Sequence, residues 1–155
     1  MKLQVDNHLR KLNKMVKNVG IVISDYYKDI SIGLEQGAIR FCSEAKINFK
    51  KFYVPGALEI GSAIKIISNK DLGIIGFIAL GCIIRGETSH FEIVINESAR
   101  ALTELSLNHS LIIGNGILTV ENEKQAIARS VKDNNNKGYH AALACSKLLD
   151  LKGNI

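Results

Sequence analysis

The residues best suited to chemistry stand together in one short stretch, Gly81-Cys-Ile-Ile-Arg-Gly-Glu-Thr-Ser-His90. It follows the apolar run GIIGFIAL and supplies a cation, a flexible glycine, two hydroxyl groups and an imidazole within a few residues. His90 is the best candidate for proton transfer because imidazole titrates near neutral pH, although a single histidine is more often structural. The other histidines, His8, His109 and His140, have no comparable surroundings in the sequence.

The same stretch is a near miss to the nucleotide-binding P-loop. Glu87 stands where that loop requires a lysine, so we exclude ATP and GTP binding. A simpler anion site remains, because Gly86, Glu87 and Thr88 lie where a strand gives way to a helix and unpaired N–H groups face outward. The alternative is that Thr88 or Ser89 only caps the helix. Arg129, in the helix after the fourth strand, offers a second cation that would favour the anion site.

Two other turns carry weaker signals. The segment 55–59, Pro-Gly-Ala-Leu-Glu, makes a sharp strand-to-helix turn. Glu59 could accept hydrogen bonds from ligand hydroxyls, or it could only favour the helix dipole. Tyr26 could offer its ring to a flat ligand. Cys82 could act as a nucleophile with His90 as its base, but no oxyanion arrangement is evident in the sequence.

Alternating strands and helices would position these residues. The hydrophobic pattern predicts strands over 19–24, 47–54, 73–81 and 110–118, and helices over 28–46, 57–69, 89–109, 122–132 and 137–151. This alternation predicts an α/β fold: a three-layer, flavodoxin-like sandwich with a four-stranded parallel sheet flanked by helices. Open parallel sheets bind ligands at the carboxyl ends of their strands. We therefore expect the site at 24–27, 54–59, 81–90 and 115–119.

Length and composition indicate one domain. The chain has 155 residues, and we expect a single domain over 19–155 after a polar lead-in over 1–18. The lead-in has no continuous apolar segment, so a secretory signal is not expected. The longest apolar run, 74–84, is too short to span a membrane and stops at Arg85.

Cysteine usage and charge narrow the class further. The three cysteines, Cys42, Cys82 and Cys145, lie far apart and show no zinc spacing, which favours a reduced, cytoplasmic location without a metal. The formal net charge is +5, but the lysines are scattered and no aromatic residues alternate with them. We therefore do not expect nucleic acid as a partner.

Several ordered segments of the chain together resemble the 6,7-dimethyl-8-ribityllumazine synthases. They are VPGALEI (54–60), LGCIIRGETSHFEIVINE (80–97), GILTVEN (116–122), QAIARS (125–130) and NKG (136–138). The resemblance runs from about Val19 to Leu149, and its IRGxTxHF block is highly specific. It implies a transferase for the penultimate step of riboflavin biosynthesis. Such enzymes condense 5-amino-6-(D-ribitylamino)uracil with 3,4-dihydroxy-2-butanone 4-phosphate, releasing phosphate and water without a metal or cofactor.

The resemblance also implies roles for individual residues. His90 would donate and shuttle protons. The phosphate substrate would be bound by Gly86, Glu87, Thr88 and Arg129. The uracil substrate would be bound by Tyr26, Ala57, Leu58, Glu59, Cys82, Ile83, Ile84, Asn115 and Lys137. The family builds pentamers, so Asn115, Arg129 and Lys137 would come from the chain next to the one that supplies the other residues.

The chain departs from the family pattern at several ring-binding positions. Leu58 and Asn115 stand where aromatic residues are common, which weakens stacking by roughly 1 kcal/mol each. Cys82 stands where the family commonly has threonine, and Gly61 stands where it commonly has proline. Residues 25–27 are Asp-Tyr-Tyr, where the family commonly has Arg-Phe-Asn. Two other classes stay open: a binding module without catalysis and an inactive shell protein. The presence of both His90 and Arg129 argues against the second.

Overall fold

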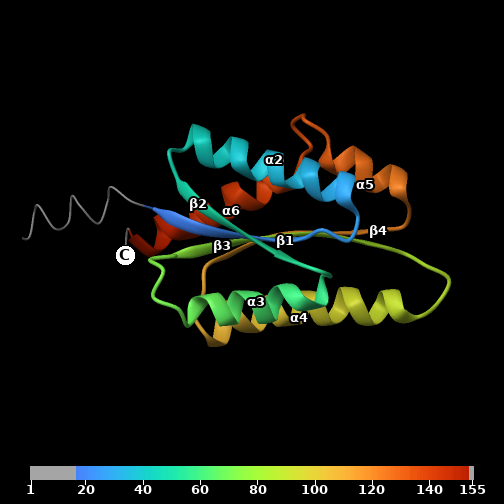
Figure 1. The fold of residues 1–155 in the computed structure, drawn as a ribbon, viewed down its shortest axis with the longest axis horizontal. Coiled ribbons are helices and arrows are strands. Elements are labelled where there is room, and N and C mark those ends of the chain that lie inside the picture. Colours follow the sequence, from blue (N-terminus) through green and yellow to red (C-terminus); the bar gives the residue numbers. More distant parts are fainter. Residues whose placement is uncertain (1–16, 154–155) are drawn as a thin grey trace, which may run out of the picture.

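Parallel pairing joins the four strands of the described residues into one sheet. The computed structural model describes residues 17–153. The strands are β1 (Asn18–Ser24), β2 (Asn48–Val54), β3 (Gly76–Ile84) and β4 (Ile113–Val120), in the order β2-β1-β3-β4. The carboxyl ends of all four strands therefore lie at the same end of the sheet (Figure 1).

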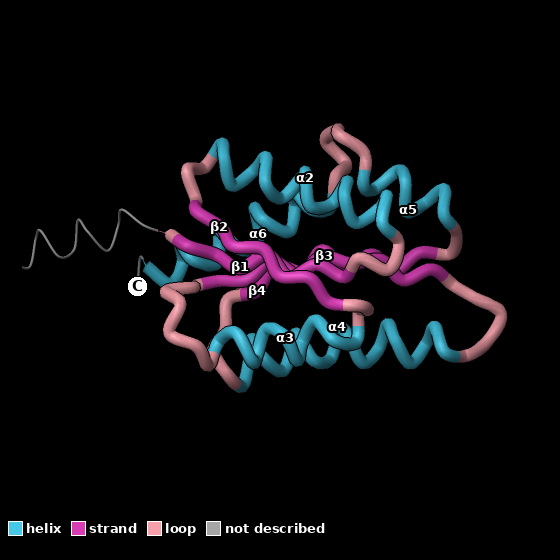
Figure 2. Tube along the Cα trace, in the orientation of Figure 1, coloured by secondary structure: helices cyan, strands magenta, loops and turns pink. Residues whose placement is uncertain are grey.

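Helices cover both faces of this sheet. One face carries α2 (Lys28–Glu44), α5 (Glu123–Ser130) and α6 (Lys137–Gly153), and the other carries α3 (Leu58–Ser68) and α4 (His90–Asn108) (Figures 1 and 2). This arrangement confirms the predicted three-layer α/β sandwich of flavodoxin-like type. It also places α4 and α5, which both follow strands of the candidate site, on opposite faces of the sheet.

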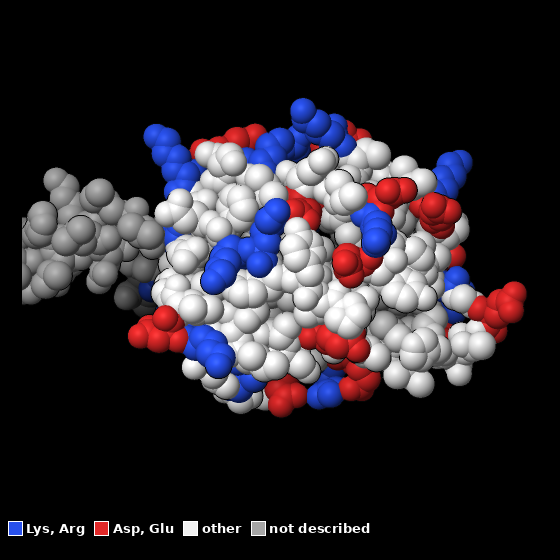
Figure 3. Space-filling view, in the orientation of Figure 1, with Lys and Arg blue, Asp and Glu red and all other residues white. Residues whose placement is uncertain are grey.

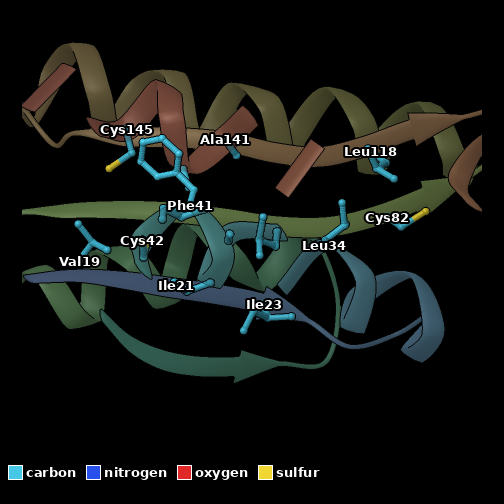
Figure 4. Close-up of a cluster of buried hydrophobic side chains, with 14 of the residues drawn as sticks. Val19, Ile21, Ile23, Leu34, Phe41, Cys42, Cys82, Leu118, Ala141 and Cys145 are labelled. Atoms are coloured by element: carbon cyan, nitrogen blue, oxygen red, sulfur yellow. The ribbon is translucent and has the colours of Figure 1, made fainter. Parts of the chain in front are cut away.

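The core lies on both sides of the sheet, as a parallel sheet requires. Alternate residues of each strand point to opposite faces. The cluster between the sheet and α2 with α6 is shown in Figure 4 and includes Val19, Ile21, Ile23, Leu34, Phe41 and Cys145. The cluster beneath α3 and α4 includes Val22, Ile60, Ile64, Phe77, Ala79 and Leu102.

The boundaries predicted for the third and fourth strands were wrong. β3 begins only at Gly76, because Gly73 takes a φ of +67° in the turn before it, and its ladder with β4 continues to the pair Ile84 and Val120. β4 begins at Ile113, because Ser110 takes a φ of +55° in the turn after α4. Residues 82–84 and Thr119 therefore lie inside strands rather than just beyond their ends.

The lead-in expected over 1–18 lies almost wholly outside the described residues, and so does His8. Lys17 is tied to the domain through an ion pair with Asp150 at 2.7 Å, and its carbonyl accepts a hydrogen bond from the backbone N–H of Asn48 at 2.9 Å. None of the helices between residues 17 and 153 combines the length and apolar character needed to cross a bilayer. On the face shown in Figure 3, lysine and arginine are interspersed with acidic residues.

Candidate active site

The turn after β1 presents an aromatic ring to solvent. Tyr26 is 72% exposed and meets the ring of Tyr27 edge-on, with 5.0 Å between ring centroids. The buried hydroxyl of Ser31 donates to the carbonyls of Ser24, at 2.6 Å, and Tyr27, at 2.9 Å. One side chain in the first turn of α2 therefore holds both ends of this turn, and Tyr26 is left free for a ligand.

The turn after β2 places a carboxylate at the same end of the sheet as Tyr26. The backbone N–H of Glu59 donates to the carbonyl of Gly56 at 3.2 Å, so the chain turns sharply into α3. A Cβ atom at Gly56 would lie 2.8 Å from Oε2 of Glu59, which shows how closely the carboxylate folds back over the turn. Ala57 is buried beneath, while Leu58 and Glu59 are exposed.

The loop after β3 leaves backbone N–H groups available. Within residues 17–153, the N–H groups of Gly86, Glu87, Thr88 and Ser89 make no hydrogen bond to the rest of the chain. Ser89, the N-cap residue of α4, makes no side-chain capping bond, and the hydroxyl of Thr88 accepts from the backbone N–H of His90 at 3.3 Å. A Cβ atom at Gly86 would meet nothing within 4 Å. The loop is therefore open to an anion.

These three turns enclose one hollow of about 430 Å³. Most of the sequence-predicted site residues line it: Tyr26, Ala57, Leu58, Glu59, Cys82, Ile83, Ile84, Gly86, Thr88 and His90. Phe91 and Val94 also line it and lie outside the predicted ranges, and Tyr27, within the range 24–27, lines it beside Tyr26. We call it the β1–β3 hollow. Glu87, predicted beside Gly86, is exposed and lines neither this hollow nor the one described next.

The remaining predicted residues lie in a second hollow of about 300 Å³ along the free edge of β4. Asn115, Arg129 and Lys137 line it, and it shares no lining residue with the first among residues 17–153. We call it the β4-edge hollow. Asn115 pairs with Ala79 within the sheet and accepts from the backbone N–H of Ile117 at 2.9 Å. One chain therefore does not bring all the predicted residues into one cavity.

His140 also lines the β4-edge hollow, beside Arg129 and Lys137, where its ring nitrogen Nε2 lies 2.8 Å from the carbonyl oxygen of Asn134. Sequence analysis set this histidine aside. A signal was present, because 137, 140, 141 and 144 repeat at the spacing of one helical face, and all four positions line the hollow.

Arg85 is a structural cation rather than a free anion ligand. Its guanidinium binds Glu121 at 2.6 Å and Glu92 at 2.7 Å, and stacks over the ring of Phe91 at 4.5 Å. The two carboxylates raise the pKa of Arg85, and the hydrogen bond from its guanidinium holds the pKa of Glu92 below its ordinary value. Arg85 thus connects the two ends of the open loop to each other and to the end of β4.

Burial decides the chemistry of the cysteine in the β1–β3 hollow. Cys82 is 5% exposed, and desolvation raises the pKa of its thiol to about 11. A thiol with that pKa is protonated near neutral pH and is a poor nucleophile. Cys82 therefore contributes shape, and His90 is the better candidate for moving protons, since it is exposed at the mouth of the hollow.

The described part of the chain offers no group of three His, Cys, Asp or Glu side chains that could hold a metal ion. What the β1–β3 hollow does offer is an aromatic ring, a carboxylate, an open backbone loop and an imidazole. This combination can hold a flat, hydroxylated molecule next to an anion and transfer protons between them.

Comparison with known proteins identifies the family of the chain. Residues 16–153 match the family model of 6,7-dimethyl-8-ribityllumazine synthase. The chain is 47% identical over 135 residues to the 6,7-dimethyl-8-ribityllumazine synthase of Bartonella tribocorum, covering 87% of this chain and 89% of that protein. It is 46% identical over 136 residues to the enzyme of the same name from Agrobacterium fabrum, covering 85% and 92%. The chain belongs to the 6,7-dimethyl-8-ribityllumazine synthase family.

Proposed function

We propose that this chain condenses 5-amino-6-(D-ribitylamino)uracil with 3,4-dihydroxy-2-butanone 4-phosphate in a site formed by the β1–β3 hollow of one copy and the β4-edge hollow of the next. The observation that carries this proposal is the convergence of Tyr26, Glu59, Gly86, Thr88 and His90 on one hollow. The amine of the uracil attacks the ketone with loss of one water, phosphate is eliminated, and ring closure with loss of a second water joins the two substrates into the lumazine. The enzyme is a transferase.

The uracil substrate fits the inner part of the β1–β3 hollow. The exposed ring of Tyr26 is available to stack on the pyrimidine, and the walls at Ile83 and Ile84 exclude water from its edge. The carboxylate of Glu59 would accept hydrogen bonds from the ribityl hydroxyls. Leu58 offers apolar contact where the family commonly has an aromatic residue, so Tyr26 carries most of the stacking.

The phosphate substrate fits the open loop. The free N–H groups of Gly86, Glu87 and Thr88 would donate to the phosphate oxygens, and the positive end of the α4 dipole favours the same charge. Glu87 would take part through its backbone, which agrees with its being exposed and lining neither hollow. Arg129 of a neighbouring copy would close the phosphate site and stabilise the leaving phosphate.

His90 would move protons during formation of the carbinolamine and departure of the phosphate. Both substrates carry their own reactive groups, so the main work of the protein is to hold them in register. Orientation of this kind can lower a barrier by roughly 7–11 kcal/mol. Proton transfer by a well-placed imidazole adds about 10²–10⁴-fold.

We propose a homo-oligomer built from pentamers, in which each site lies between two copies. The separation of the two hollows within one chain supports this. So do exposed apolar side chains on two unlike surfaces, for example Ile66 and Ile93 on α3 and α4, and Ile127 and Leu148 on α5 and α6. Contact between two unlike surfaces produces a closed ring when the rotation between copies allows it.

The cellular setting is also a proposal. The three cysteines are free and buried, as is usual for proteins of a reducing compartment, and we propose a cytoplasmic location. We further propose that residues 19–155 form a single catalytic domain.

The direct test mixes the purified protein with both substrates and follows lumazine absorbance and fluorescence together with phosphate release. We expect one phosphate per lumazine and no product when either substrate is omitted. Binding of lumazine or riboflavin without any turnover would identify a binding module and refute the catalytic proposal.

A further inference from the structure

The side chain of Asn136 connects three segments of the chain. It is 1% exposed, and the two N–H bonds of its Nδ2 are shared among the carbonyls of Gly33 in α2, Ser130 at the end of α5, and Val131, each 3.0 Å from Nδ2. Its Oδ1 accepts from the backbone N–H of Tyr139 at 3.0 Å, in the first turn of α6. Both polar atoms of this amide are therefore in use, inside the fold.

The segments held by Asn136 are those that carry the cations of the β4-edge hollow. Arg129 directly precedes Ser130, whose carbonyl would otherwise be an orphan acceptor at the end of α5. Lys137 directly follows Asn136 and begins α6. The backbone of His140 is also attached, because its N–H donates to the carbonyl of Asn136 at 3.2 Å. The side-chain amide and the backbone carbonyl of Asn136 together fix the backbone that carries these three side chains.

The surface of α2 is fitted to this loop. A Cβ atom at Gly37 would lie 1.9 Å from Oδ1 of Asn136, and one at Gly33 would lie 2.2 Å from the carbonyl oxygen of Ser130. Because real Cβ atoms do not come so near, any side chain at either position would push the loop outward. The loop is consequently held against α2 by close packing as well as by hydrogen bonds.

We propose that Asn136 is a positioning residue of the condensation: it holds Arg129 and Lys137 where they can reach the phosphate and uracil bound in the β1–β3 hollow of a neighbouring copy. Asn136 itself lies behind the β4-edge hollow and does not line it. This inference rests on the proposed function. Asn136 acts through Arg129, which distinguishes it from a purely structural residue. Substitution of Asn136 should therefore weaken the binding of the phosphate substrate.

The test uses Asn136→Asp, which keeps the size of the side chain and the acceptor for Tyr139 but removes both N–H donors. We expect the KM for the butanone phosphate to rise about ten-fold or more, and kcat to change by less than about three-fold. In an Arg129→Ala background the same substitution should leave that KM unchanged, since the residue through which it acts is gone. Lys124→Ala is the matched control, because Lys124 lies on the same helix as Arg129 and outside both hollows. In this background, Asn136→Asp should again raise the KM by the full amount.

Two results would overturn the proposal. One is an unchanged KM in Asn136→Asp with lower kcat and melting temperature. The other is the same KM increase with and without Arg129. Either would make Asn136 a purely structural residue. If Asn136→Asp does not fold, Asn136→Ser, which keeps one donor, replaces it with the same two criteria. Inactivity of the unmodified protein would instead refute the proposed function, so the two failures are distinguishable.

Discussion

The candidate site divides its work among a few side chains of different chemistry. His90 is exposed at the mouth of the β1–β3 hollow, Tyr26 presents its ring, and the loop from Gly86 to Thr88 offers backbone donors. None of these groups has to form a covalent bond with a substrate. The account therefore predicts graded losses when single residues are removed.

Replacement of His90 by alanine should slow the reaction without stopping it. We expect kcat to fall about 100-fold, the usual contribution of one general acid–base group, with little change in either KM. Steady-state lumazine formation measures all three constants. If His90→Ala were completely inactive, His90 would have to do more than transfer protons.

Removal of Arg129 should act mainly on the phosphate substrate. A charge-assisted hydrogen bond contributes about 1.5–3 kcal/mol, so Arg129→Ala should raise the KM for the butanone phosphate about 10–100-fold. Lys124→Ala on the same helix should leave this KM unchanged. An equal rise in both variants would indicate a general charge effect rather than a specific contact.

Cys82 should be dispensable as a nucleophile. Because burial raises the pKa of its thiol to about 11, Cys82→Ala should keep kcat within about ten-fold of the unmodified protein. Turnover of the variant at pH 7 measures this directly. Loss of activity in a variant that still folds and binds both substrates would restore the nucleophile hypothesis.

The sequence indicated which single residues could do chemistry better than it indicated which of them lie together in one hollow. The stretch 81–90 could be interpreted because an abrupt change from apolar to reactive residues is visible in one dimension. His140 was missed although its helical spacing from Lys137 was visible, because only the turn from α5 to α6 brings Arg129 to the same hollow. Cys82 stayed ambiguous, since its protonation depends on burial that a sequence does not display.

At the level of elements, Arg85 links the end of β3 to the first turn of α4 and to the end of β4 through Glu92 and Glu121. Both ion pairs are at the surface, and each such pair contributes little stability. Their effect is geometric: they fix the two ends of the loop that would hold the phosphate.

This link predicts a defined dependence of stability on pH. Arg85 lowers the pKa of Glu92 in the folded chain from its ordinary value of 4.5. The pair therefore stabilises the fold above about pH 4.5, and this stabilisation is lost as pH falls through the lowered pKa. Urea unfolding at pH 7 and pH 3.5 should show a smaller acid-induced loss in Glu92→Gln than in the unmodified chain. An equal loss in both would show that the pair does not contribute.

The order and type of the elements were predictable, and their ends were not. Apolar runs separated by amphipathic segments predicted all four strands and the helices of the described residues. The ends of β3 and β4 depend on the register of their ladder and on positive φ angles at Gly73 and Ser110, which an apolar pattern does not encode. The error mattered, because it placed Cys82, Ile83 and Ile84 beyond a strand when they lie within β3.

At the level of the whole molecule, one chain provides two half-sites. The β1–β3 hollow and the β4-edge hollow are lined by different residues, and α4 and α5 lie on opposite faces of the sheet (Figure 1). The chain also exposes apolar side chains on both helical layers, such as Ile66 on α3 and Ile127 on α5, as a ring of identical copies requires. The central claim is that catalysis needs both half-sites, each from a different copy.

Complementation between two defective variants tests this claim most directly. His90→Ala and Arg129→Ala chains, carrying different tags, are co-expressed, and the mixed oligomers are purified and assayed at low butanone phosphate. The account predicts that about a quarter of the sites in a random mixture regain both residues, so activity rises well above that of either variant alone. Activity no greater than the average of the two separate variants, in oligomers shown to contain both chains, would contradict it.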